Sequence, residues 1–429
     1  MPNIVTNQIK ISNSKNFIEK LSDTDTTLYV FLGKPSPWNT ENNPPALLDS
    51  YENAAYIWDN ILGLKKILAN DVKNVVKRIN WENEEIYDQY DDQDINLFSK
   101  RFYVINREFD VYKCISNNGG SPSTVEPAGK NLNIFTTADG YRWKYLYTVS
   151  TADQLKFLTK NWMPVQKDTS VSEYATDGSI DELILINGGT DYSAFANITI
   201  SGDGSGTVIN PKNRIGVING FDYISTGSGY RYANAKINDS TGRFANIRAI
   251  ISPVGGHGYD PIQELNAHYV MLSARTEYNE GYGDIPPLVK FRQLGIIRNP
   301  KDQQERIANS LSLSGLYKLE LSNVSGTFLM NEFLVGSNSK ANAFCITANN
   351  AVNVSTLSYI QTIDLTYNFS DFISNETVVG SLSGATGIVS NILLPEAKHD
   401  TGEILYVENR TPVTRALDQA ELLHLVIEF

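Results

Sequence analysis

Two stretches of the chain share seven residues at a constant separation of 44 positions, and this repeat restricts the folds open to the chain. The repeated pairs are Phe328/Phe372, Asn331/Asn375, Glu332/Glu376, Gly336/Gly380, Ser337/Ser381, Ser339/Ser383 and Ala341/Ala385. Two copies are too few for a solenoid, which needs about three or more repeats. We therefore predict that residues 316–394 hold two copies of one small β unit, packed on each other as a single sandwich or barrel.

A second β-rich segment lies earlier in the chain, between about residues 176 and 255. Gly, Ser, Asn and Thr are frequent there, and short β-branched runs alternate with glycine turns. A glycine turn followed by Tyr and a strand occurs twice, in 188–200 and 227–237, and a third glycine turn closes the segment at 255–259. Glycine permits positive φ, and the aromatic side chain can pack on a neighbouring strand. The pattern predicts an inserted all-β module.

The remaining residues, 1–175, 256–315 and 395–429, are expected to form one discontinuous core. At roughly 150 residues per domain, a chain of 429 residues has room for about three domains. With the two β modules included, the predicted fold class is mainly β (α+β): a discontinuous β-sandwich core with helix-bearing loops, plus two inserted small all-β modules.

The first part of this core combines strand and helix signals. The apolar run Leu28–Leu32 ends at Gly33 and predicts a buried strand. Apolar residues recur at three- and four-residue steps within 49–68, which predicts a helix with Asp49 and Ser50 as candidate caps. Further strands are predicted over 102–115 and over 141–149. In the second of these, Trp143, Tyr145 and Tyr147 alternate with other residues, as in a half-buried sheet.

The charge balance excludes one class of partner. Lys and Arg number 36 and Asp and Glu number 48, which gives a net charge of -12. This is the wrong sign for a protein whose affinity comes from neutralising phosphates, so nucleic acid is not expected as the main partner. Hydrophobic residues make up 41% of the chain and charged residues 20%, which excludes disorder throughout.

The cysteines and the amino terminus indicate where the chain is made. Cys114 and Cys345 are the two cysteines and lie far apart, which favours a reduced, cytosolic origin over a disulfide scaffold. The amino terminus has no basic-then-apolar signal pattern, and no run approaches about 18 apolar residues. We expect neither signal-directed secretion nor a membrane-spanning segment.

Glycine- and serine-rich motifs in the chain do not predict catalysis. Gly202–Gly206 follows a strand-like run but precedes no helix, so we interpret it as a plain turn and not as a phosphate loop. Gly380–Gly384 has the spacing of a serine nucleophile elbow, yet Leu382 occupies the position of the nucleophile.

No metal-binding pattern emerges either. A calcium loop begun at Asp92 would place Leu97 where glycine must turn, so the acidic run 84–94 is interpreted as a solvated loop. None of the four histidines forms a pair at ligand spacing; these are His257, His268, His399 and His424. We assign no catalytic residue, no metal ligand and no cofactor.

Aromatic residues and stiff loops leave binding open. The chain has 23 Tyr and 5 Trp, and both types are favoured in interface hot spots. The loop Pro35–Asn39 is stiff enough to dock with little loss of entropy. Aromatic residues on strands are also common in sheet packing, so an interface role and local packing both remain possible.

Four segments, in chain order, carry a resemblance to a known family. They contain Phe31, Gly33, Pro37-Trp38 and Pro44-Pro45; Val111–Cys114, Glu126-Pro127 and Asp139–Leu146; Phe291–Ile297 with Asn299-Pro300; and Gly402–Arg410 with Pro412, Asp418-Gln419 and Glu421. Together they resemble the gene eight baseplate wedge family of T-even-like contractile-tailed bacteriophages. The two β modules are departures from that family, and family contacts made near them are in doubt.

The resemblance implies a structural virion protein of the tail baseplate, made in the host cytoplasm, with no enzyme activity. It implies a homodimer that contacts other wedge subunits and tail-fibre attachment proteins, with no nucleic acid or membrane partner. The candidate interface residues are Pro35, Pro37, Trp38, Tyr406, Glu408, Asn409 and Arg410. Arg410 could bond a partner's carboxylate or backbone, or hold its own domain together.

A rival hypothesis is a tail-associated glycan-binding module or depolymerase. The β repeats and the aromatic residues motivate it. Cleavage of a sugar chain usually needs two carboxylates placed across the bond, and the sequence nominates no such pair.

Overall fold

The computed structural model describes residues 6–21, 25–276, 278–279, 282–283, 285–286, 288–362, 370–416 and 420–429. These residues form 29 strands, five α-helices and two 3-10 helices, so the predicted mainly β fold is confirmed. None of the helices in the described ranges is both long and apolar enough to span a membrane.

The chain divides into two compact units. Unit 1 consists of Met1–Asn16, Lys73–Met271 and Val426–Phe429, and unit 2 consists of Phe17–Val72 and Leu272–Leu425. Four elements contribute residues to both units: α1 (Asn7–Lys20), β3 (Val72–Lys77), β15 (Tyr269–Thr276) and β29 (Glu421–Glu428).

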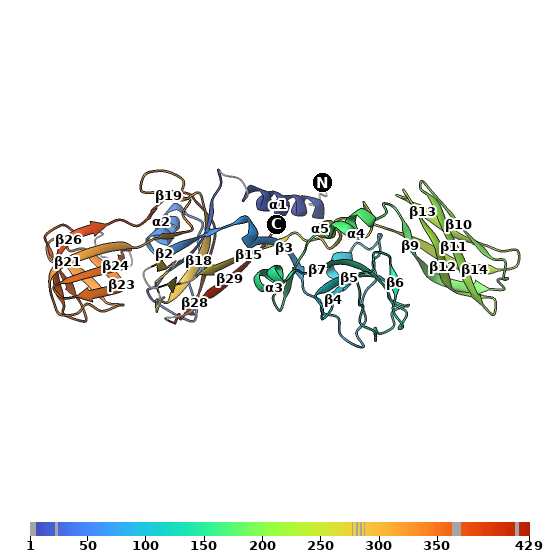
Figure 1. Cartoon of the computed structure of the whole chain (residues 1–429), viewed down its shortest axis with the longest axis horizontal. Coiled ribbons are helices and arrows are strands. Elements are labelled where there is room, and N and C mark those ends of the chain that lie inside the picture. Colours follow the sequence, from blue (N-terminus) through green and yellow to red (C-terminus); the bar gives the residue numbers. More distant parts are fainter. Residues whose placement is uncertain are drawn as a thin grey trace. The chain divides into compact units, whose positions relative to one another are not determined.

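Unit 2 contains a five-stranded antiparallel sheet in the order β20-β2-β1-β18-β28 (Figure 1). Its strands are β1 (Leu28–Gly33), β2 (Ile61–Ile67), β18 (Phe291–Arg298), β20 (Ser312–Ser314) and β28 (Glu403–Val413). All of β1 is buried, because Tyr29 and Phe31 pack in one hydrophobic cluster and Leu32 packs in another. The strand predicted from the apolar run is confirmed.

Helix α2 (Tyr51–Asp59) begins where predicted but ends early. The predicted cap is confirmed, since the Ser50 side chain accepts a hydrogen bond from the Asn53 N–H at 3.2 Å. The prediction of helix as far as residue 68 is wrong, because β2 begins at Ile61. The buried residues of β2 pack inside the sheet, and a short apolar run suits a strand buried on both faces as well as a helix.

Unit 2 also contains several short elements outside this sheet. They are η1 (Ala69–Asp71), the paired strands β16 (Tyr278–Asn279) and β17 (Tyr282–Gly283), and the paired strands β19 (Lys301–Asp302) and β27 (Ala397–Lys398).

The 44-residue repeat folds into a closed six-stranded barrel within unit 2, in the order β21-β24-β23-β22-β25-β26. Its strands are β21 (Tyr317–Ser325), β22 (Phe333–Gly336), β23 (Asn342–Ala351), β24 (Val354–Ile360), β25 (Thr377–Gly380) and β26 (Thr386–Leu393). The equivalent strands β22 and β25 pair with each other, with Val335 opposite Val379. The two copies of the repeat therefore meet across equivalent positions.

Each repeated glutamate in the barrel holds the loop of the other copy. The carboxylate of Glu332 accepts hydrogen bonds from the N–H groups of Leu382 and Ser383 at 3.0 and 2.9 Å. The carboxylate of Glu376 accepts them from Asn338 and Ser339 at 3.1 and 3.0 Å. These exchanged contacts explain why Glu and Ser recur together in the repeat.

Unit 1 contains a four-stranded antiparallel sheet in the order β4-β5-β7-β6. Its strands are β4 (Tyr103–Ile105), β5 (Asp110–Ser116), β6 (Phe135–Thr136) and β7 (Arg142–Thr148). The other elements of this part of the unit are β3 (Val72–Lys77), which pairs with β8 (Trp162–Pro164), η2 (Leu97–Ser99), α3 (Thr151–Phe157), α4 (Thr169–Tyr174) and α5 (Pro261–Glu264).

The single strand predicted over 102–115 is wrong, because β4 and β5 form a hairpin there. The Asn106 side chain accepts hydrogen bonds from the N–H groups of Glu108 and Asp110 at 3.0 and 2.9 Å, and Phe109 adopts a φ of 63°. An Asn side chain that bonds backbone N–H groups nearby is typical of a turn.

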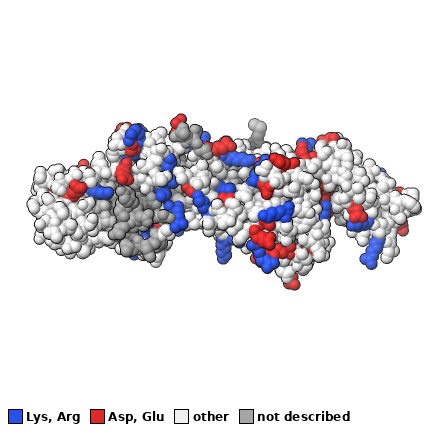
Figure 2. All heavy atoms as spheres, viewed as in Figure 1, with Lys and Arg blue, Asp and Glu red and all other residues white. Residues whose placement is uncertain are grey.

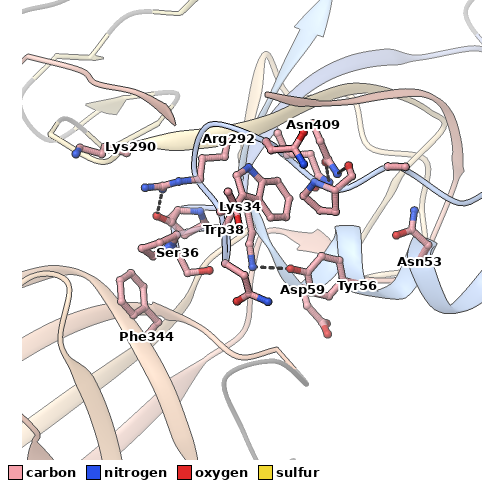
Figure 3. Close-up of a pocket in the computed structure, with 18 of the residues that line it drawn as sticks. Lys34, Ser36, Trp38, Asn53, Tyr56, Asp59, Lys290, Arg292, Phe344 and Asn409 are labelled. Atoms are coloured by element: carbon pink, nitrogen blue, oxygen red, sulfur yellow. Dashed lines mark hydrogen bonds between the residues drawn. The ribbon is translucent and has the colours of Figure 1, made fainter. Parts of the chain in front are cut away.

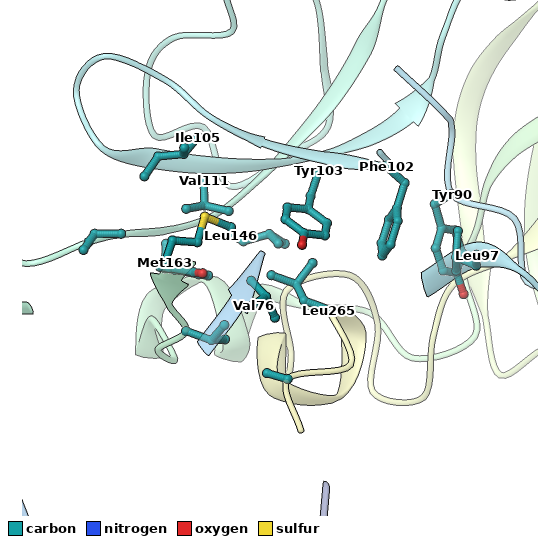
Figure 4. Close-up of a cluster of buried hydrophobic side chains, with 14 of the residues drawn as sticks. Val76, Tyr90, Leu97, Phe102, Tyr103, Ile105, Val111, Leu146, Met163 and Leu265 are labelled. Atoms are coloured by element: carbon teal, nitrogen blue, oxygen red, sulfur yellow. The ribbon is translucent and has the colours of Figure 1, made fainter. Parts of the chain in front are cut away.

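The four-stranded sheet of unit 1 is covered on both faces around β7, and not on one face as a half-buried sheet would be. Strand β7 is buried along both faces, and even Lys144 is only 5% exposed. One cluster joins Phe102, Val111 and Leu146 with Leu265 from the segment after α5 (Figure 4). The expectation of a half-buried strand is corrected by this second layer of packing.

The acidic run 84–94 forms a loop whose acidic side chains are exposed or partly exposed, as predicted, and several of them also form ion pairs. Arg248 donates from both terminal nitrogens to Asp91, at 3.0 and 2.5 Å. Arg101 pairs with Glu85 at 2.8 Å, and Lys100 pairs with Asp94 at 2.5 Å. Acidic and basic side chains lie interspersed on the face seen in Figure 2.

The glycine-rich segment of unit 1 forms six strands with a hydrophobic cluster of their own (Figure 1). The strands are β9 (Ile180–Thr190), β10 (Asn197–Gly202), β11 (Ser205–Arg214), β12 (Val217–Ser228), β13 (Ala233–Asn238) and β14 (Arg243–Ile251), paired as β9 with β14, β10 with β13 and β11 with β12. Residues 203–204 link β10 to β11 without a helix, so the predicted turn is confirmed. That this module is an insertion in a discontinuous core remains a prediction.

The aromatic residues of the weak repeat pack on glycines. A Cβ atom on Gly242 would lie 2.2 Å from the Tyr192 ring, and one on Gly204 would lie 2.5 Å from the Tyr230 ring. The third motif is built in the same way, with Gly255 against Tyr259. Glycine is therefore required at these positions for close approach.

Candidate interface

The stiff loop after β1 begins at a close approach of two backbone segments in unit 2. A Cβ atom on Gly33 would lie 2.9 Å from the carbonyl oxygen of Asn60. The next residue, Lys34, has a φ of 55°, which turns the chain out of the sheet. Two prolines then follow, Pro35 buried and Pro37 exposed. The local sequence thus fixes the direction in which the loop leaves β1.

Arg292 of β18 holds this loop in place through hydrogen bonds. Its guanidinium forms a two-bonded pair with the Glu41 carboxylate, at 2.8 and 2.6 Å, and donates a third hydrogen bond to the Pro35 carbonyl oxygen. The Arg292 side chain is 3% exposed. The hydrogen bonds from Arg292 lower the pKa of Glu41 from its usual value. A buried arginine with three bonds fixes the loop geometry.

Trp38 is buried beneath the loop and does not project from it. Its indole Nε1 donates a hydrogen bond to the Arg410 carbonyl oxygen at 3.0 Å. The Lys34 ammonium lies 5.1 Å from the centre of the Trp38 ring and 5.0 Å from that of Tyr56, whose hydroxyl it also bonds. The aromatic side chain therefore joins the loop, helix α2 and strand β28.

Asn409 makes a second connection between the two predicted segments. Its side-chain oxygen accepts a hydrogen bond from Gln293 at 2.8 Å, and its side-chain nitrogen donates one to the Pro45 carbonyl oxygen at 3.0 Å. Nearby, the Tyr406 hydroxyl donates to the Glu408 carboxylate at 3.1 Å. Residues predicted separately at positions 35–38 and 406–410 thus lie in one place.

Arg410, one of the seven candidate residues, is bonded to Trp38 through its backbone and not through its side chain. Trp38 bonds its backbone carbonyl, but no hydrogen bond or ion pair of its guanidinium is found among the described residues. The Arg410 side chain is partly exposed. Pro37 is exposed as well, whereas Pro35 and Trp38 are buried.

Of the seven candidates, Pro35, Pro37, Trp38 and Asn409 line a groove of about 1380 Å³ on unit 2 (Figure 3). One side of the groove is the loop after β1 with helix α2, and Phe333, Phe344 and Asn331 of the barrel segment also line it. The polar lining is rich in side-chain amides, namely Asn39, Asn43, Asn53, Asn331, Gln293 and Asn409. Amides offer both donors and acceptors, which suits the backbone of a bound polypeptide.

The groove does not bring together a catalytic or metal-binding set. In the part of the chain that the structure describes, no group of three or more His, Cys, Asp or Glu side chains is placed to hold a metal ion. The charged groups that line the groove are Lys34, Lys290, Arg292, Glu52 and Asp59. Arg292 is already committed to Glu41 and the loop.

Sequence reasoning missed several of the lining residues. Arg292 and Gln293 were noted as part of a family segment, not as parts of a site. Their signal is two long polar side chains inside an otherwise apolar strand, between Phe291 and Leu294. Phe333 and Phe344 had no local signal, because their place at the groove depends on how the barrel folds.

Comparisons with known proteins agree with the family resemblance seen in the sequence. The family model described as Gp8 of bacteriophage T4 matches residues 3–116. The resemblance to the Gp8 family is confirmed. The baseplate wedge protein gp8 of Enterobacteria phage T4 is 21% identical over 211 residues, with 40% of this chain and 63% of that protein covered. The chain thus spans less than two thirds of this Gp8 relative.

The range matched by the Gp8 family model covers only some of the candidate interface residues. Residues 3–116 include Pro35, Pro37 and Trp38, whereas Tyr406 and Arg410 lie outside them. The structure joins the two sets through the hydrogen bond from Trp38 to Arg410.

Proposed function

We propose that this chain is a structural subunit of a phage tail baseplate wedge and acts by protein–protein association in the virion. The observation that carries the proposal is the Gp8 resemblance, whose matched range contains the loop that borders the groove. The β-rich fold and the absence of a metal-holding cluster among the described residues are compatible with a structural role.

The groove on unit 2 is the surface we propose for a neighbouring wedge subunit. Its amide-rich lining can bond the backbone of an extended segment, and the exposed Leu48 and Phe333 side chains can bury apolar surface. Arg410, which follows the groove residue Asn409 in the sequence and is partly exposed, can form a two-bonded pair with a partner's carboxylate. A stable contact of this kind buries about 1,200–2,000 Å² in total.

The finer assignments extend this proposal. We propose that the chain forms a homodimer in the wedge, and that tail-fibre attachment proteins are among its neighbours. The two β modules are the candidate docking surfaces for such contacts, and the hydrophobic cluster inside each one holds it as a compact body.

The depolymerase alternative gains no support from the barrel. Its two repeated glutamates, Glu332 and Glu376, are 0% and 1% exposed. Each carboxylate accepts four or more hydrogen bonds from loop N–H and hydroxyl groups. They stabilise loops and cannot reach a sugar chain.

The test is co-expression of the chain with the other wedge proteins of its own phage. We expect a complex that copurifies and whose mass, by light scattering, includes this chain. The charge reversal Arg410→Glu should weaken copurification, whereas Lys318→Glu on the barrel exterior should not. A chain that stays alone at micromolar concentration and is retained on an oligosaccharide column would contradict the wedge proposal.

A further inference from the structure

The glycine-rich module carries an exposed apolar tip at one end. Its most exposed large apolar side chains there are Phe195, Ile215 and Phe244, at 89%, 93% and 78% exposure. Phe195 lies in the turn between β9 and β10, and Ile215 lies in the turn between β11 and β12. Phe244 is the second residue of β14, next to the turn that connects β13 to β14. We call these three residues, with their neighbours Arg214 and Arg243, the module tip.

Hydrogen bonds join the three turns of the module tip to one another. The Asn213 side chain donates to the carbonyl oxygens of Tyr192 and Ser193, at 2.6 and 3.0 Å. The Tyr192 N–H donates to the Gly216 carbonyl oxygen at 3.0 Å. The Thr241 hydroxyl donates to the Asp191 carbonyl oxygen at 2.8 Å. The three turns therefore form one assembly.

Asp239 fixes the third turn against the first. Its carboxylate accepts hydrogen bonds from the N–H groups of Ser193, Thr241 and Gly242, at 3.2, 2.8 and 2.7 Å, and from the hydroxyls of Ser193 and Thr241. A carboxylate with five donors leaves its turn little freedom. The exposed apolar residues are thus held in place before any partner arrives.

The backbone at the module tip is strained where the apolar side chains project. Ile215 has a φ of 55° and Phe244 a φ of 68°. Positive φ is a rare conformation for a bulky residue and above all for a β-branched one, and glycine would occupy it without cost. A fully exposed isoleucine at such a position costs stability twice, through strain and through exposure. Costs of this kind concentrate at binding sites.

We propose that the module tip docks into an apolar pocket, edged by carboxylates, on a neighbouring protein of the same particle; this inference rests on the proposed baseplate function. The guanidinium groups of Arg214 and Arg243 are exposed, and no ion pair of either is found among the described residues. Two such groups beside apolar anchors match carboxylates at the rim of a pocket.

The charges of the module tip favour a protein over a lipid surface. Binding to anionic lipid typically uses a cluster of about four to eight Lys or Arg. The tip has two arginines, and the exposed Asp191 lies among them. Rigid turns also suit a pocket of fixed shape better than a fluid bilayer.

The test places a photoreactive benzoylphenylalanine at position 195 of the full chain in assembled phage particles. We expect a covalent adduct with one other particle protein, and a roughly tenfold lower yield when Arg214→Glu and Arg243→Glu are combined. Benzoylphenylalanine at the exposed Tyr232, at the opposite end of the module, is the matched control.

A second variant separates docking from folding. Ile215→Gly relieves the positive φ, so the melting temperature should stay equal or rise while the adduct yield falls. Absence of the chain from purified particles would contradict the baseplate function itself. Incorporation without an adduct above the Tyr232 control, or tip-dependent binding to vesicles of phosphatidylglycerol, would overturn the docking proposal alone.

Discussion

The indole Nε1 of Trp38 lies 3.0 Å from the carbonyl oxygen of Arg410, to which it donates a hydrogen bond across 372 positions of the sequence. The bond joins the loop after β1 to the edge strand β28 of the same sheet. It engages only the backbone of Arg410, whose side chain is partly exposed. One contact therefore serves the fold of unit 2 and the geometry of its proposed interface.

Replacing Trp38 by Phe should destabilise the protein by about 1–3 kcal/mol, because the Arg410 carbonyl oxygen loses its donor and part of the buried ring is lost. Urea unfolding followed by fluorescence and circular dichroism measures the change. Tyr51→Phe, at a side chain that is 97% exposed, is the control and should change stability by less than about 0.5 kcal/mol. An equally small effect at Trp38 would show that the hydrogen bond is dispensable.

The pair of Glu41 and Arg292 predicts a pH dependence. Hydrogen bonds from Arg292 lower the pKa of Glu41 below its usual value of 4.5 in the folded state. A carboxyl group with a lowered folded pKa contributes stability that is present above its unfolded pKa and lost as the pH falls through the folded one. Glu41→Gln should therefore lower stability at pH 7 and flatten its dependence on pH between about 5 and about 3.

Denaturant unfolding at several pH values tests this dependence. Glu52→Gln, exposed on helix α2, is the matched control. Parallel stability profiles for the original chain and Glu41→Gln would contradict a role for the pair in acid sensitivity.

Local patterns in the sequence predicted the elements that depend on near neighbours. The run Leu28–Leu32 became β1, and Ser50 became the cap of α2. The repeat predicted a small β unit, and its glutamates proved to hold the loops of the opposite copy. These features could be predicted because the residues that form each pattern in the sequence also make the contacts that stabilise the element.

Features set by distant partners could not be predicted in the same way. Ile61–Ile67 has apolar spacing that fits a helix, and only pairing with β1 makes it a strand. The hairpin turn at Asn106 interrupts a run that looks like one strand. The groove shows the same limit. The sequence predicted Trp38 as an interface residue but could not show that its side chain is buried, because its hydrogen-bond partner Arg410 lies 372 positions away.

The buried glutamates of the barrel give a matched pair of predictions. Glu332→Ala leaves the N–H groups of Leu329, Leu382 and Ser383 without their acceptor, and Glu376→Ala does the same to the equivalent loop. Each change should cost about 3 kcal/mol, since buried donors are left unpaired. The two costs should agree within about 1 kcal/mol because the two contacts are equivalent.

Acid should weaken the same contacts. Burial by itself raises the pKa of Glu332, but hydrogen bonds from the Leu329, Ser383 and Leu382 N–H groups outweigh it, so the folded pKa is lowered. Stability from Glu332 is thus lost as the pH falls through that lowered value. Calorimetry at neutral and acidic pH checks both effects, and Lys318→Ala on the barrel exterior is the control. Unequal costs for Glu332 and Glu376 would contradict the equivalence of the two copies.

Deletion of Asp181–Pro253 tests whether the glycine-rich module is an insertion. The two ends of the module are adjacent, because Ser179 and Ser252 exchange hydrogen bonds at 2.9 Å, so Ile180 can be joined to Val254 with little rearrangement. The shortened chain should fold and melt cooperatively. It should be about 2–5 kcal/mol less stable, since the cluster that contains Phe102 and Leu146 loses Ile250. Differential scanning calorimetry and near-ultraviolet circular dichroism measure both properties. Loss of the cooperative transition would show that the module is part of the core, and Ile250→Ala in the full chain separates the cost of that side chain from the cost of the deletion.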